Sequence, residues 1–209
     1  MNPELIDQLK QLGLNLGANG LPYKLPIHPV LVHFTLGLFI IGIIFDLAAT
    51  FFAWERPILK FLDLPVLRSN FYAVGFYNVL ASAAITFFTV TAAFFEIMLA
   101  QPPLNEKSDW GLGAGTTMIL HGIGGVLLLF IIVAMCVWRG LLRYRWRQGK
   151  SREVVWTYLL AGVAILGIMY VHGTLGAHLG GDFGFHNTAG NLLKQGQDPN
   201  VLLQEKVIR

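Results

Sequence analysis

Four apolar stretches, each long enough to cross a bilayer as a helix, constrain the fold more than any other feature of this sequence. The hydrocarbon core of a membrane is about 30 Å thick, and about 20 residues of helix span it. Stretches of sufficient length cover residues 29–53, 71–99, 114–138 and 154–177. Only 13% of the residues are charged, whereas soluble domains carry about 25%. The sequence therefore predicts an all-α fold, an integral membrane four-helix bundle.

The chain divides into three segments by composition. Residues 1–24 carry a short apolar stripe, which predicts an amphipathic helix lying on the membrane surface. Residues 25–187 hold the four spans and form the transmembrane domain. Residues 188–209 are polar and form a tail outside the lipid. The single cysteine, Cys136, excludes an internal disulfide and a covalently attached c-type haem.

Basic residues gather in two of the loops. Of the fifteen Lys and Arg residues, three fall within 54–69 and six within 139–152. Loops rich in Lys and Arg near the ends of spans remain cytoplasmic. We therefore predict an inner or thylakoid membrane protein with both termini on the periplasmic or lumenal side. These loops should also attract anionic lipid head groups, and their charge does not indicate nucleic-acid binding.

All six histidines fall on the opposite side, which we call the outer side. They are His28, His33, His121, His172, His178 and His186. Ionisable residues within a membrane span are costly and mark functional sites. Histidines from facing helices are the usual axial ligands of haem b in a helix bundle. We predict His33 and His121 as the first axial pair. His28 and His172 form a possible second pair, with His178 in reserve.

Three glycines lie in register with these histidines. Gly37 follows His33 by four residues, so both lie on one face of the helix. Gly124 and Gly125 follow His121 by three and four residues. Small residues at these positions would leave room for a macrocycle beside the ligand. Glycine is also common where membrane helices touch, so helix packing is an equal explanation.

The same histidines could hold a copper or zinc ion directly, because imidazole suits both metals. The candidate ligands are His28, His33, His121 and His172. Asp182 or Glu96 would supply an oxygen ligand or orient a histidine. Asp46, near the inner end of the first span, is expected to pair with an arginine of a cytoplasmic loop.

The stretch "HPVLVHFTLGLFIIGIIFDL", which begins at His28, resembles the opening signature of the bacterial membrane proteins called domain of unknown function 2231 (DUF2231). A later membrane histidine, here His121, and a glycine-rich end, here "LGGDFGFHN", also resemble that family. The resemblance covers residues 25–187. It implies a four-helix membrane fold and marks His28, His33 and His121, and it implies no established function.

From the residues, the leading hypothesis is a haem b protein that transfers electrons at the outer side. It would exchange electrons with a soluble carrier, a quinol or a neighbouring subunit. The resemblance to the DUF2231 family adds the expectation that the chain is part of a respiratory or photosynthetic electron-transport complex. No residue set resembles a hydrolytic site, so catalysis by the chain alone is not expected. The alternatives are a non-redox accessory or assembly subunit of a membrane complex, and a copper or zinc site.

Overall fold

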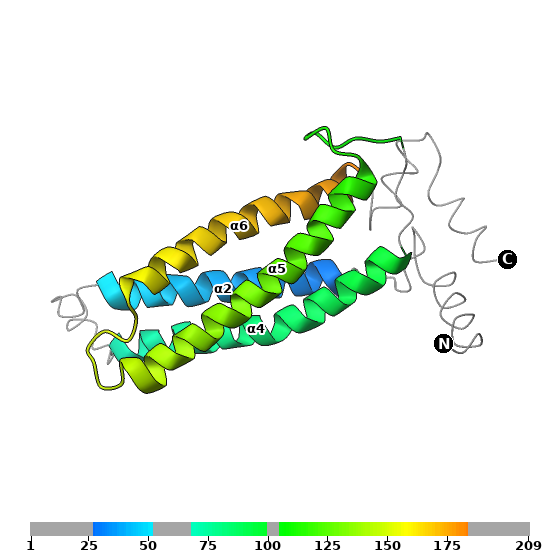
Figure 1. The fold of residues 1–209 in the computed structure, drawn as a ribbon. Coiled ribbons are helices and arrows are strands. Elements are labelled where there is room, and N and C mark those ends of the chain that lie inside the picture. The colour runs from blue at the N-terminus through cyan, green and yellow to red at the C-terminus, as the bar shows by residue number, and fades with distance from the viewer. Residues whose placement is uncertain (1–26, 52–67, 100–104, 184–209) are drawn as a thin grey trace, which may run out of the picture. The chain divides into compact units, whose positions relative to one another are not determined.

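The computed structural model describes residues 27–51, 68–99 and 105–183. Most of these residues belong to four long helices (Figure 1). These are α2 (Ile27–Phe51), α4 (Arg68–Leu99), α5 (Ala114–Leu141) and α6 (Trp156–Gly181). A π-helical turn, η2 (Leu142–Trp146), continues α5. All four helices are long and apolar enough to cross a membrane. The predicted four-helix membrane bundle is confirmed, whereas the predictions for the two terminal segments and for His186 lie outside the described residues.

Two helices extend beyond the C-terminal ends of the predicted spans. The third span was expected to end at residue 138, before Arg139, but α5 and η2 together reach Trp146. The arginine remains helical because its charge is paired inside the protein, as described below. The fourth span was expected to end at residue 177, and α6 instead reaches Gly181. His178 is therefore a helical residue.

The chain forms two compact units, which we name after their characteristic side chains. The histidine unit consists of Met1–Pro29, Thr91–Gly125 and Val171–Arg209, in so far as these are described. The arginine unit consists of Val30–Val90 and Val126–Tyr170. Helices α2, α4, α5 and α6 each contribute residues to both units.

Within the arginine unit, α2 and α4 run antiparallel and pack through small and hydroxyl-bearing residues. The Thr35 and Thr89 hydroxyls lie 3.0 Å apart, and Ser82 Oγ donates to the Thr35 carbonyl at 2.8 Å. Further along, Gly42 and Gly75 approach so closely that a Cβ on Gly42 would lie 3.1 Å from the Gly75 carbonyl oxygen. Small residues allow membrane helices to touch, and buried hydroxyls then find partners across the interface.

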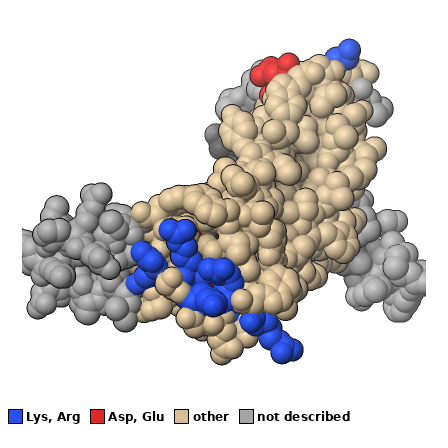
Figure 2. Space-filling model, turned by 60° about the vertical axis from the view of Figure 1, so that its left-hand side comes forward, with Lys and Arg blue, Asp and Glu red and all other residues tan. Residues whose placement is uncertain are grey.

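The surface of the arginine unit is apolar along the helices and basic beside η2. Large hydrophobic side chains are exposed on all four helices, including Phe88 and Phe130, each 67% exposed. Such side chains suit contact with lipid. Figure 2 shows most of the blue Lys and Arg side chains in one area of a largely tan surface. Arg145 in η2 is exposed, and so are Lys150 and Arg152, which follow η2 in the sequence.

Candidate metal-binding site

Three histidines come together in the histidine unit from three different helices. His28 lies in the first turn of α2, His121 in the first half of α5, and His172 in the second half of α6. The His121 and His172 rings stack with centroids 4.2 Å apart and an interplanar angle of 5°. The His28 ring meets His121 edge-on, with centroids 6.0 Å apart. We call these three residues the histidine cluster.

A backbone hydrogen bond orients the His121 ring. Its Nδ1–H donates to the carbonyl oxygen of His172 at 3.3 Å. A neutral imidazole that donates from Nδ1 carries its lone pair on Nε2, the nitrogen that can bind a metal. Metal-binding histidines are commonly held in this way by a carbonyl group. His172 Nδ1 is buried and has no hydrogen-bond partner among the described residues.

Glycines make room for both stacked rings. A Cβ on Gly124 would lie 2.6 Å from His172 Nδ1, and a Cβ on Gly176 would lie 2.9 Å from His121 Cε1. Gly125 also faces His172, at 3.8 Å. The imidazole of His172 lies against Gly124 and Gly125, and the predicted contact of these glycines with a macrocycle stays a prediction. These glycines bring α5 and α6 close enough for their histidines to stack.

A second group of metal-ligating side chains lies in the same unit. His178 Nδ1 and Asp182 Oδ2, one helical turn apart, are 2.6 Å from each other. The backbone N–H of Asp109 donates to the same carboxylate oxygen at 3.2 Å. One ligand atom from each of the three residues lies within 4.8 Å of the others. The Trp110 ring covers His178 edge-on at 5.0 Å.

A tight turn places Asp109 beside α6. The N–H of Gly111 donates to the Ser108 carbonyl at 2.7 Å, and Gly111 has φ 74°. Glycine adopts this left-handed conformation without steric cost. The i,i+4 spacing of His178 and Asp182 could have indicated their contact from the sequence. The participation of Asp109 depends on the turn, and no sequence signal pointed to it.

The structure does not test the predicted roles of His33 and Gly37. His33 is exposed on α2 in the arginine unit, and a Cβ on Gly37 would meet no atom within 4 Å. The His33–His121 axial pair therefore stays a prediction. Glu96, which was named as a possible oxygen ligand, is buried in the histidine unit and 8% exposed.

The arginine unit contains a buried ion network. Arg139 Nε and Nη2 donate to the two carboxylate oxygens of Asp46, both at 2.9 Å, and both side chains are fully buried. Nη2 also donates to the carbonyl of Tyr72 at 2.9 Å. Glu153 accepts from Arg139 at 3.4 Å and from Arg143 at 2.8 Å. The predicted pairing of Asp46 with an arginine is confirmed, although the arginine belongs to α5 and not to a loop.

Comparison with known proteins matches the chain to one family of membrane proteins. A family model described as "Predicted membrane protein (DUF2231)" matches residues 24–189. No curated protein and no solved structure gives a significant match.

Proposed function

The chain belongs to the DUF2231 family of predicted membrane proteins, and we propose that it binds a transition-metal ion through His28, His121 and His172. The orientation of His121 carries this proposal. Its Nδ1–H is held by a backbone carbonyl, and its ring lies against two other imidazoles from two other helices. Imidazoles that lie together without a carboxylate suit copper or zinc.

The donor set also suggests what the metal could do. Three histidines would leave a fourth coordination position for water or another small ligand. Because α2, α5 and α6 each supply one imidazole, the bound ion would also join three helices. The metal site would thus keep one open coordination position, and the chemistry at that position depends on which metal binds.

Haem b with electron transfer is the second candidate function. It is favoured by the origin of the histidines on separate helices and by the glycines beside them. Two axial imidazoles bind on opposite faces of a porphyrin, so rings stacked at 4.2 Å would have to separate. A single metal ion also requires the stacked rings to turn, because the lone pair of an imidazole nitrogen lies in the ring plane. It needs no space for a macrocycle between the rings, and for this reason we place it first.

Metal analysis and an absorption spectrum of the purified protein test both functions. We expect about one copper or zinc ion per chain and no Soret band. His121→Ala and His172→Ala should each lose the ion, whereas His178→Ala, in the neighbouring Asp–His–Asp group, should keep it. A Soret band that disappears in His121→Ala would replace the first proposal with haem.

Two other results would contradict metal binding by the histidine cluster. Loss of the ion only in His178→Ala would assign it to Asp109, His178 and Asp182. The protein could also bind neither metal nor haem when it is reconstituted with each. The remaining interpretation would then be an accessory subunit whose histidines are structural. In that case His121→Ala should lower stability by the same amount with and without added metal, because no ligand is linked to folding.

A further inference from the structure

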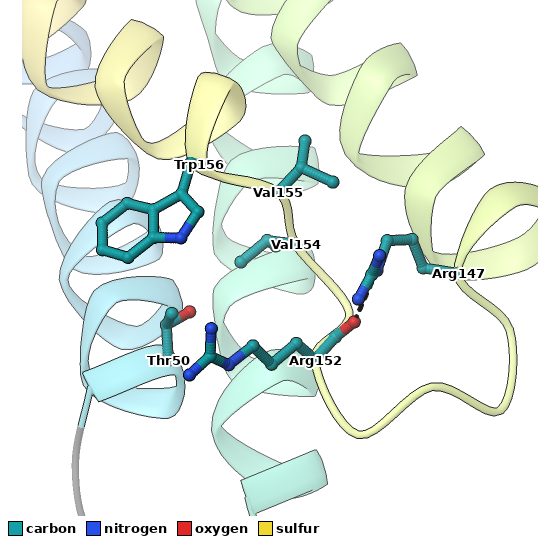
Figure 3. A pocket seen from close by; sticks show the side chains of 6 residues that line it. All are labelled: Thr50, Arg147, Arg152, Val154, Val155 and Trp156. Carbon is teal, nitrogen blue, oxygen red and sulfur yellow. Dashed lines mark hydrogen bonds between the residues drawn. The ribbon is translucent and has the colours of Figure 1, made fainter.

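A small pocket lies in the arginine unit beside the basic surface (Figure 3). Its volume is about 140 Å³. It is lined by Thr50, Arg147, Arg152, Val154, Val155 and Trp156. The lining therefore joins the end of α2, the segment after η2 and the start of α6. The pocket shares no residue with the histidine cluster.

Two guanidinium groups give the pocket a positive charge. Arg147 Nε donates to the Arg152 carbonyl oxygen at 2.7 Å, which fixes the connection between η2 and α6. In Figure 3 the Arg152 side chain extends towards Thr50. The neighbouring carboxylate, Glu153, faces Arg139 and Arg143 instead. Among the described residues, no carboxylate pairs with the guanidinium of Arg147 or Arg152.

Aromatic residues indicate that the pocket lies at the edge of the lipid. Trp156 begins α6 and Phe51 ends α2, and their rings are in contact with centroids 4.9 Å apart. Tyr144, Trp146 and Trp156 are each more than half exposed. Tryptophan and tyrosine are enriched at the level of lipid head groups. A pocket at the ends of spanning helices with such a border is accessible to a head group and to the first part of its acyl chains.

We propose that this pocket binds the phosphate group of an anionic phospholipid. Guanidinium groups bind phosphate oxygens with paired hydrogen bonds, and Arg147 and Arg152 would supply them. Val154, Val155 and the Trp156 ring would contact the glycerol and the upper acyl chain. Basic pockets between membrane helices bind anionic head groups in the same way. A free phosphate ion has the same anionic chemistry but gains nothing from the apolar part of the lining.

Native mass spectrometry of the intact detergent-purified chain, titrated with phosphatidylglycerol or phosphatidylcholine, tests the proposal. We expect phosphatidylglycerol to bind more tightly. Arg152→Gln should weaken its binding about ten-fold, the usual effect of losing one charged hydrogen bond. Lys150→Gln is the matched control. Lys150 is exposed and lies two residues from Arg152, and its substitution removes the same positive charge. It should leave the affinity nearly unchanged.

Three outcomes would overturn the proposal. Equal losses in Arg152→Gln and Lys150→Gln would mean a diffuse attraction to basic charge and no defined site. Equal binding of both lipids would exclude recognition of the anionic head group. Complete displacement of phosphatidylglycerol by inorganic phosphate would assign the pocket to a free anion. Thermal unfolding of each variant, measured without added lipid, confirms that the compared proteins are folded.

Discussion

Arg139 is fully buried, whereas arginine side chains are mostly exposed in proteins. Its side chain belongs to a helix that spans the membrane, and it donates to Asp46, Tyr72 and Glu153. When one partner of a buried ion pair is removed, the other charge stays buried without compensation. The free-energy cost of this change is larger than the net stabilisation that the intact pair provides. Asp46 and Arg139 are thus required together.

Asp46→Asn should lower the free energy of unfolding by about 3–5 kcal/mol. The amide keeps the size of the carboxylate but leaves the arginine without its bidentate partner. Unfolding by sodium dodecyl sulfate in mixed micelles measures this. Arg145→Gln, at an exposed position beyond the network, is the control and should change stability by less than about 0.5 kcal/mol. An unchanged midpoint for Asp46→Asn would contradict the structural role of the pair.

Gly176 gives a test of the histidine cluster that leaves every histidine in place. A methyl group there would lie 2.9 Å from His121 Cε1, so Gly176→Ala should displace that ring. We expect metal affinity to fall about ten- to a hundred-fold, the range for loss of a group that orients a ligand. Metal competition titration measures the change. Gly173→Ala on the same helix, with no atom within 4 Å of the added Cβ, should retain wild-type affinity.

At the scale of the helices, the α2–α4 pair depends on close approach of backbones. A Cβ on Gly42 would lie 2.7 Å from Val79 Cγ2 and 3.1 Å from the Gly75 carbonyl oxygen. Gly42→Ala should therefore force α2 away from α4 and lower stability by about 1–3 kcal/mol. The same unfolding assay measures this. A variant as stable as the wild type would mean that the helices pack less closely than described.

Gly37→Ala on the same helix is the matched control for Gly42→Ala. Nothing lies within 4 Å of the added methyl group, so the higher helix propensity of alanine should leave stability equal or slightly raised. This variant also tests the predicted haem contact at Gly37. If a haem is found, an unchanged absorption spectrum in Gly37→Ala would mean that Gly37 does not contact the haem.

The existence and type of the helices followed from the sequence because length and hydropathy alone identify membrane spans. Their ends were less predictable. A span was expected to stop at Arg139, since a sequence does not show that a residue 93 positions earlier will neutralise the charge. The hydroxyl contacts of Thr35, Ser82 and Thr89 were also missed, because single Ser and Thr residues in an apolar run carry no periodic signal.

The sequence indicated that the histidines lie on one side of the membrane, but it did not show which of them are in contact. Their location in the sequence indicated a common site, and His28, His121 and His172 do lie together. Which face of each helix points inwards depends on packing, and the weak amphipathicity of these helices does not reveal it. Gly124 lies against His172 of α6, and the predicted contact of this glycine with a haem stays a prediction.

At the scale of the whole molecule, the distribution of charge predicts its orientation. The exposed arginines beside η2 should face the cytoplasm, and the segment before α5 should face the outer side. With Cys136 replaced by alanine, single cysteines at Glu106 and Ser151 report this, because both positions are exposed. A membrane-impermeant maleimide added to intact cells should label position 106 and not 151. Labelling of position 151 alone would reverse the predicted topology.

The buried pair of Asp46 and Arg139 has a consequence for the synthesis of the protein and its insertion into the membrane. The two residues are 93 positions apart, so at about 5–20 residues per second the carboxylate is made on the order of ten seconds before its arginine. During that interval α2 carries a charge that lipid tolerates poorly. The nascent chain therefore needs either a proton on Asp46 or shelter at the insertion machinery. Chains that stop before Arg139 should be degraded faster than full-length chains, and Asp46→Leu should prolong their lifetime.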